Sequence, residues 1–226
     1  MCTTSAQNAH TLAVTSIHEL SGATISDDPT ACRQCHEVEV EGYDRSTMGH
    51  SLRPGGREPP GSVTTSDVRT TFEKSSDGTR QVPDSVGYSE RFPVYYVTGS
   101  GTHASGYLMD IGDHLFQSPI ACYRSRRAYG PAPGFEVYPD PDFTRPVTPG
   151  CLFCHAVEAV PVSGSGNEYA SSPFHALAIG CSRCHGSPAA RLVDPGPGNI
   201  INPARLSPAA RIITDKCRRR PGSLLT

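Results

Sequence analysis

Three copies of the pattern Cys-x-x-Cys-His are the residues of this sequence whose types and spacing could do chemistry. They occupy residues 32–36, 151–155 and 181–185 and use six of the nine cysteines. Side chains at positions i and i+3 lie on one face of a helical turn, roughly 5–6 Å apart. Two thiols at that spacing can bond to one edge of a flat ligand, while the imidazole that follows binds a metal ion at its centre. This arrangement is the attachment signature of haem c.

Each motif therefore predicts one covalently attached haem c, three in all. The cysteines would form thioethers with the porphyrin, and the histidines would be the proximal ligands of the iron. The predicted thioether residues are Cys32, Cys35, Cys151, Cys154, Cys181 and Cys184. The predicted proximal ligands are His36, His155 and His185.

Three other interpretations of the cysteines explain less of the pattern. Zinc and iron–sulfur sites also use Cys-x-x-Cys, but a zinc site normally combines two such pairs around one ion and needs no His directly after each pair. A disulfide framework would leave the three histidines without a role. A thioredoxin-like redox motif needs a βαβ frame, which the sequence lacks.

The second axial ligand decides what each haem does, because His or Met gives a six-coordinate electron carrier and an open position admits a substrate. His103 is one candidate, since the glycines before it permit close approach of the backbone to a flat cofactor. His175, six residues before the third motif, is another candidate. Met48 and His50 compete for one role, with Met48 preferred. The remaining histidines are His114, expected at the surface beside a hairpin turn, and His10 and His18 near the N-terminus.

The composition gives a reason to expect cofactors in the interior. The sequence has 22 Gly, 21 Pro and no Trp among 226 residues, and only 36% of its residues are apolar. Such a chain has little with which to build a large side-chain core. We therefore expect a mostly irregular, loop-rich multihaem fold with few short α-helices and a small antiparallel β insertion, in which the haems form the core. Because cofactor binding then supplies folding energy, we expect the chain without haem to be largely unfolded.

Local signals predict how the chain is organised. Residues 1–30 form a polar N-terminal arm, and residues 31–217 form the haem-binding domain. Within this domain, β-branched and aromatic runs at residues 68–72, 91–98, 106–111 and 114–116 predict a β insertion over about residues 66–124. Hairpin turns are expected at residues 75–78 and 111–113. A last short helix is expected over residues 207–217, and residues 218–226 form a disordered tail.

The sequence resembles the multihaem c-type cytochromes with doubled Cys-x-x-Cys-His motifs, in particular the haem modules often joined to tetratricopeptide repeats. The resemblance covers roughly residues 30–217. It includes connecting phrases as well as haem motifs, at residues 46–51, 96–103, 114–120, 145–155, 180–186 and 202–207. It implies that His36, His155 and His185 are proximal ligands, that His103 is a distal ligand, and that Met48 occupies a position where the family has a Met or His ligand.

The sequence departs from this family in three places. The family usually has a His a few residues after the third motif, whereas residues 187–191 here contain none, so His175 or an open position would complete that haem. A fourth motif is usual after residues 202–207, but here Cys217 is followed by three arginines. We interpret Cys217 as the first cysteine of a fourth site broken by a frameshift or truncation. Third, the N-terminus lacks the features of a signal peptide, and we expect the export signal to be missing from this sequence.

The predicted function is electron transfer through covalently bound haems, with the chain acting as a carrier rather than an enzyme. The alternative is a redox enzyme that acts on a small inorganic nitrogen or sulfur compound at a five-coordinate haem. A third class is a metal-binding interaction domain without haem. Expected partners are redox proteins, including other cytochromes or a tetratricopeptide-repeat region.

The net charge of −2 gives no support to nucleic-acid binding, and no apolar stretch long enough for a transmembrane helix is present. Because haem of this kind is attached after export, we expect a periplasmic or extracellular location. Cys2 and Cys122 have no predicted role.

Overall fold

A computed structural model describes residues 29–65, 67–84, 90–136, 143–156, 159–174 and 176–208. The described residues form twelve β-strands, five short α-helices and one 3-10 helix. The chain divides into two compact units. We call Arg53–Val147 the β unit, and Ile25–Leu52 together with Thr148–Thr226 the motif unit.

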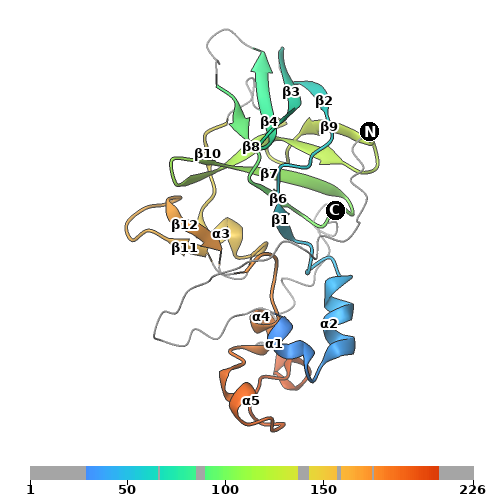
Figure 1. Ribbon diagram of the computed structural model, residues 1–226, viewed down its shortest axis with the longest axis vertical. Helices are drawn as coiled ribbons and strands as arrows, with labels where there is room; N and C mark the ends of the chain where they lie inside the picture. The colour runs from blue at the N-terminus through green and yellow to red at the C-terminus, as the bar shows by residue number, and fades with distance from the viewer. Residues whose placement is uncertain are drawn as a thin grey trace. The chain divides into compact units, whose positions relative to one another are not determined.

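A four-stranded antiparallel sheet lies in the β unit, in the order β2-β3-β4-β5 (Figure 1). Its strands are β2 (Gly61–Thr65), β3 (Val68–Ser75), β4 (Gly78–Asp84) and β5 (Phe92–Pro93). Alternate residues of β3 and β4 are buried, which is the period of a strand with one face toward a core. The predicted turn at residues 75–78 is confirmed, and Gly78 takes the positive φ of 135° that the turn requires.

A second sheet runs in the order β1-β6-β7-β8-β10, with β9 also paired to β8. Its strands are β1 (Leu52–Pro54), β6 (Tyr96–Thr98), β7 (Ala104–Ile111), β8 (His114–Tyr123), β9 (Ala128–Pro131) and β10 (Arg145–Pro146). The predicted turn between β7 and β8 is confirmed: Gly112 and Asp113 both have positive φ, at 60° and 65°, as a two-residue type I′ hairpin turn needs.

Side chains from both sheets form the core of the β unit. One cluster joins Phe72 of β3 to Val97, Tyr107, Ile120 and Cys122 of the other sheet. The Phe72 ring stacks on Tyr129 at 4.0 Å between centroids and lies 5.3 Å from Tyr107. Further apolar clusters form around Met109 and around Phe135. Full burial of one such side chain contributes about 1.5–3 kcal/mol, so the β unit is held together by its own residues.

The motif unit is built from short elements. Its helices are α1 (Thr30–Arg33), α2 (Glu37–Asp44), α3 (Pro149–Leu152), α4 (Ser182–His185), α5 (Ala189–Val193) and the 3-10 helix η1 (Pro203–Arg205), and its one hairpin joins β11 (Ala159–Pro161) to β12 (Tyr169–Phe174). Glu37 and Glu39 in the first turn of α2 favour its start, because carboxylates interact well with the exposed N–H groups there. Pro149 at the start of α3 has the φ a first helical turn needs.

The predicted fold class is wrong. From the sequence we expect a loop-rich multihaem cytochrome fold with a small β insertion and a core made of haems, but antiparallel strands dominate the regular structure of the described residues. The physical reason is that composition averages over the whole chain, while the apolar residues are concentrated in the strands of the β unit. Proline content is a second reason, because it favours loops in a prediction from sequence. Several prolines of this chain nevertheless lie in strands of the β unit: Pro54, Pro83, Pro93, Pro119, Pro131 and Pro146.

Pro119 illustrates how a strand accommodates proline. The register of β7 and β8 shifts there: Leu108 pairs with Gln117, whereas Gly106 pairs with Ala121. The strand β8 therefore bulges around Pro119, where no ladder donor is needed. A proline at this position does not interrupt the sheet.

The predicted domain boundaries stay predictions, since the arm and the tail fall almost wholly outside the described residues, as does nearly all of the helix expected over residues 207–217. Within the described ranges, no helix has the length and apolar character needed to cross a membrane.

Candidate functional site

All three motifs lie in the motif unit, although more than a hundred residues separate the first from the second. The first motif includes the end of α1, the second overlaps α3, and the third overlaps α4. Each motif therefore lies on or next to a helical turn, the local geometry that its spacing predicts.

The backbone bonds of the first and third motifs follow the same pattern. In the first, the N–H groups of Cys35 and His36 donate to the carbonyl of Cys32 at 3.2 and 2.9 Å. In the third, Cys184 and His185 donate to the carbonyl of Cys181 at 3.1 and 2.9 Å. These bonds close the turn over the four residues that carry the thiols and fix where the histidine leaves it.

The second motif is closed differently. The His155 N–H donates to the carbonyl of Leu152 at 2.9 Å, and the Leu152 N–H donates to Thr148 at 3.2 Å. The Thr148 hydroxyl also lies 3.5 Å from the Cys151 sulfur. None of the described cysteines forms a disulfide.

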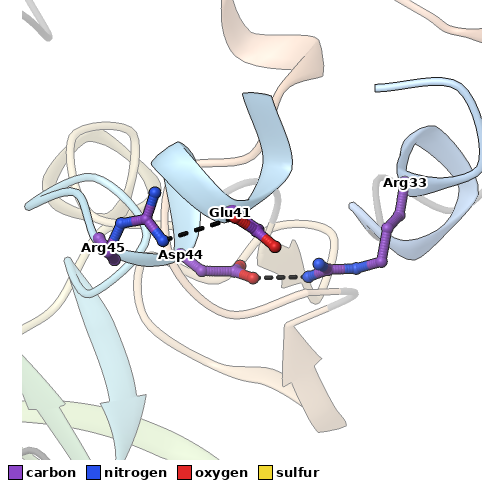
Figure 2. A network of polar contacts seen from close by, with 4 residues as sticks. All are labelled: Arg33, Glu41, Asp44 and Arg45. Carbon is purple, nitrogen blue, oxygen red and sulfur yellow. Dashed lines mark hydrogen bonds and ion pairs between the residues drawn. The ribbon is translucent and has the colours of Figure 1, made fainter. Parts of the chain in front are cut away.

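His36 is exposed and lies close to a carboxylate. It precedes α2, and its Nδ1 atom is 3.9 Å from Oε2 of Glu39. Figure 2 shows the charged residues that organise this region: Arg33 donates to Asp44 at 2.6 Å, and Arg45 lies 3.7 Å from Glu41. The Arg33–Asp44 ion pair joins the first motif to the adjoining helix α2. It makes no link to the second or third motif.

His155 is more enclosed. Its Nδ1 atom is buried without a hydrogen-bond partner among the described residues. Burial lowers the pKa of the His155 imidazole, and a hydrogen bond with the Ser51 backbone works in the opposite direction. The neutral ring that this environment favours is the form that binds a metal ion.

His185 has the hydrogen bond that orients a metal ligand. Its Nδ1 atom lies 2.9 Å from the carbonyl oxygen of Ile201, and the Ile201 N–H donates back to the His185 carbonyl at 3.2 Å. Metal-binding histidines usually use one ring nitrogen in this way, which leaves the other for the metal. Gly186 has φ +70°, and a Cβ atom there would lie only 3.0 Å from Ile201, so glycine permits the close approach of these two segments.

The second and third motifs are in direct contact through Arg183. This residue lies between the two cysteines of the third motif, and its Nη2 atom donates to the carbonyl of Ala156 at 3.1 Å. Its guanidinium lies 4.3 Å from the centroid of the Phe153 ring, inside the second motif. The two attachment turns are therefore neighbours in space as well as in sequence.

The segment that contains Met48 and His50 is bonded to parts of the chain near the second and third motifs. The Met48 carbonyl accepts from the Ile179 N–H at 3.3 Å, two residues before the third motif. The buried Ser51 hydroxyl lies 2.9 Å from the carbonyl of His155 and 2.9 Å from that of Met48. Met48 is half-buried and His50 is exposed. Ligation by Met48 stays a prediction, but this segment is not associated with the first motif alone, as sequence proximity suggested.

The remaining predicted ligands lie elsewhere. His103 is an exposed residue of the β unit, and its carbonyl accepts from the Arg124 N–H at 2.9 Å. His114 is also in the β unit, with Nδ1 2.8 Å from the Gly112 carbonyl. The structure thus brings the three histidines predicted to be proximal ligands into one unit and places His103 in the other, and ligation by all four stays a prediction. Other residues singled out from the sequence lie outside the described residues: Cys2, His10, His18, His175 and Cys217.

Some large apolar side chains are exposed near the motifs. Three large apolar side chains are exposed next to the three motifs: Val38 at 75%, Phe153 at 41% and Ile201 at 47%. Water contact with such groups is unfavourable, and a porphyrin ring would remove it. Tyr169 is buried near the second motif: burial, and to a smaller extent the charge of Cys151, raises its pKa to about 12.

Each motif carries two cysteines and one histidine, the residue types of a haem c attachment sequence. Across the described ranges, no three His, Cys, Asp or Glu side chains gather in a group that could hold a metal ion. Each motif instead supplies one histidine and two nearby thiols, which suits one iron porphyrin per motif.

Three residues that the sequence did not indicate contact the motifs. Ser51 and Arg183 contact the second motif region from distant parts of the chain, and the Ile201 carbonyl bonds to His185 of the third motif. Such contacts leave no spacing signal. One sequence feature could have indicated the contact between the second and third motifs. These motifs are close in sequence, and one contains an aromatic residue, Phe153, while the other contains a cation, Arg183.

Comparison with known proteins gives one structural likeness to report. The fold is similar to the solved structure of an outer cell wall cytochrome named OcwA, with a TM-score of 0.52 and 15% sequence identity. The match covers 84% of this chain and 36% of that one, so this chain spans about a third of that cytochrome. At this identity the likeness concerns the fold alone. No family model matches the sequence, and no curated protein is similar to it.

Proposed function

We propose that this chain is an electron-transfer module that binds three c-type haems covalently. The observation that carries the proposal is that the three Cys-x-x-Cys-His motifs fold into one unit, with the second and third in direct contact. Three redox groups held in one small unit are suited to passing electrons between them. The fold likeness to a cytochrome supports the same class of protein.

The residues of the motifs have separate tasks in this proposal. The cysteines anchor each porphyrin at one edge, and His36, His155 and His185 bind the three irons. The carbonyl of Ile201 holds the imidazole of His185 in place, and burial lowers the pKa of the His155 imidazole. When bound, each haem would supply an iron that gains or loses one electron, with no substrate bond made or broken.

The distal ligands belong to the same proposal. His103, Met48 and His175 are the residues proposed for this role. Two histidines on one iron would give a low potential, and a methionine would raise it. Mixed ligation would therefore favour electron flow in one direction among the three sites.

The proposed setting follows from the cofactor. Covalent attachment of haem c after export implies a periplasmic or extracellular protein, and the cell-wall cytochrome of similar fold is compatible with that location. Its partners would then be other redox proteins, which donate electrons to the exposed edges of the haems or accept electrons from them.

Absorption and haemochrome spectra of exported protein test the proposal. We expect a pyridine haemochrome with the band position of haem bound through two thioethers, and low-spin spectra in both oxidation states. Nitrite or cyanide should leave these spectra unchanged. A shift on addition of either ligand would favour the alternative of an enzyme with an open haem, and a colourless protein would remove both functions.

A further inference from the structure

Arg183 stands out because it belongs to one haem motif and contacts another. Its side chain makes two separate contacts with the second motif region, the hydrogen bond to the Ala156 carbonyl at 3.1 Å and the stacking over the Phe153 ring at 4.3 Å. Phe153 lies between Cys151 and Cys154, and Ala156 directly follows His155. One side chain thus contacts both the middle and the end of the neighbouring attachment turn.

A guanidinium is well suited to hold two such turns together. It is planar, so it can stack on an aromatic ring and donate in its own plane at the same time. A cation over an aromatic ring contributes about 0.5–1 kcal/mol at exposed sites and more when water is excluded. Arg183 is half-buried, so both contacts are partly shielded from water.

We infer that Arg183 is a positioning residue that fixes the separation of the second and third haem sites, and with it the rate of electron exchange between them. This inference rests on the proposed function. Each turn anchors its own porphyrin through two cysteines, so a contact between the turns fixes the two anchoring points relative to each other. Loss of the contact changes the spacing of the two haems without removing any bond that attaches them.

The rest of the motif unit limits what a substitution at Arg183 can do. Ser51 bonds to the His155 carbonyl, and Ile179 bonds to the Met48 carbonyl. Both segments are therefore also tied to residues 46–51, and they stay in the same region when Arg183 is changed. We expect a looser spacing of the two turns rather than an unfolded unit.

The first motif offers a matched control. Arg33 also lies between the two cysteines of a motif, but its guanidinium bonds to Asp44 of the adjoining helix α2 (Figure 2). Arg33→Gln removes the same charge from an equivalent turn and breaks a contact local to one motif. If Arg183→Gln changes the coupling of the haems or the rate of electron exchange more than Arg33→Gln does, the excess comes from the lost contact between the two motifs.

The experiment compares wild type, Arg183→Gln, Phe153→Leu and Arg33→Gln as exported, haem-loaded proteins. Intact mass counts the haems, circular dichroism in the Soret region reports the coupling of neighbouring haems, and flash photoreduction gives the rate of electron exchange between them. We expect three haems in every protein. We expect Arg183→Gln and Phe153→Leu to lose the split Soret signal and to show slower exchange, and Arg33→Gln to keep both as in wild type.

The outcomes separate this inference from the proposed function. If wild type carries no haem, the proposed function fails. If wild type carries three haems but Arg183→Gln and Phe153→Leu match Arg33→Gln in signal and rate, only the role of Arg183 is overturned. Should Arg183→Gln mature poorly, Phe153→Leu decides alone, because it removes the stacking partner and leaves the arginine in place.

Discussion

The histidines of the three motifs have equivalent places in the sequence and different surroundings. The His36 ring lies 3.9 Å from a carboxylate, that of His185 bonds to a carbonyl, and that of His155 is enclosed. The partner of the second ring nitrogen and the polarity around a metal ligand both influence the electronic properties of the metal. We therefore expect haems bound at these sites to have separate potentials.

Ser118 of β8 offers a test of the polar part of the β unit's core. Its hydroxyl donates to Gln81 Oε1 at 2.5 Å, and both residues are fully buried. Ser118→Ala leaves the Gln81 oxygen without this donor, which should cost about 1–3 kcal/mol. Denaturant unfolding measures the loss. Ser62→Ala, at an exposed position of β2, is the control and should change stability by less than about 0.5 kcal/mol. Equal stabilities of the two variants would contradict this view of the core.

Glu58 is a buried carboxyl that links stability to pH. Burial raises the pKa of Glu58 above its ordinary value of 4.5, and the hydrogen bond from the Gly56 N–H and the charge of Arg53 offset part of that rise. The folded state therefore favours the protonated form more than the unfolded state does. Its contribution is fully present below pH 4.5 and is lost as the pH rises through the folded pKa.

Glu58→Gln should remove this pH dependence. The amide keeps an oxygen for the Gly56 N–H and carries no charge, so the variant should melt at a higher temperature than wild type at pH 7. Below pH 4.5 the two should melt together. Thermal scans followed by far-ultraviolet circular dichroism check both conditions. A variant that is less stable than wild type at pH 7 would contradict the burial argument.

At the scale of elements, local signals were predictable and pairing was not. The turns at residues 75–78 and 111–113 and the helical turn at each motif have short sequence signatures, and the structure contains them. The strands β9, β10 and β12 contain proline or lie in proline-rich stretches, so their β-propensity alone predicts loops. They form because β8 and β11 offer them partners, which no local pattern indicates.

The turn between α4 and α5, which contains Gly186, carries a prediction at this scale. Gly186 has φ +70° and ψ −168°, a conformation open almost only to glycine, and it faces Ile201. Gly186→Ala should cost about 1–3 kcal/mol in backbone strain and displace the carbonyl that orients His185. We expect intact mass to show a larger share of protein that lacks one haem.

The matched control is Gly42→Ala in α2, where a Cβ atom would meet nothing within 4 Å and φ is not positive. Alanine is the better helix former, so this variant should keep three haems. Equal haem content in the two variants would show that the Gly186 turn is not needed to seat the third haem.

At the scale of the whole molecule, the two units differ in what holds them together. The β unit has apolar clusters from two sheets, whereas the motif unit consists of short helices and one hairpin with large apolar groups exposed beside its motifs. The helical turns at the motifs could be predicted from the spacing of their residues, and the haem chemistry of the motifs stays a prediction. The sequence did not predict the β unit's core, because that core depends on pairing between strands up to several tens of residues apart.

Because the β unit has apolar clusters of its own, the expectation that the chain without haem is largely unfolded changes. We now expect the β unit to stay folded without haem. Hydrogen exchange on protein made without haem-attachment machinery should show protected amides in β3, β4, β7 and β8. The motif unit should exchange faster than in haem-loaded protein. Uniformly fast exchange through both units would contradict this division.

The most direct test of the central claim is the intact mass of the chain, exported behind an added signal peptide in cells that attach haem c. We expect the mass of the processed polypeptide plus three haems. Replacing both cysteines of one motif, as in Cys181→Ser with Cys184→Ser, should remove exactly one. A mass equal to that of the bare polypeptide, from cells that mature a control cytochrome normally, would contradict the account.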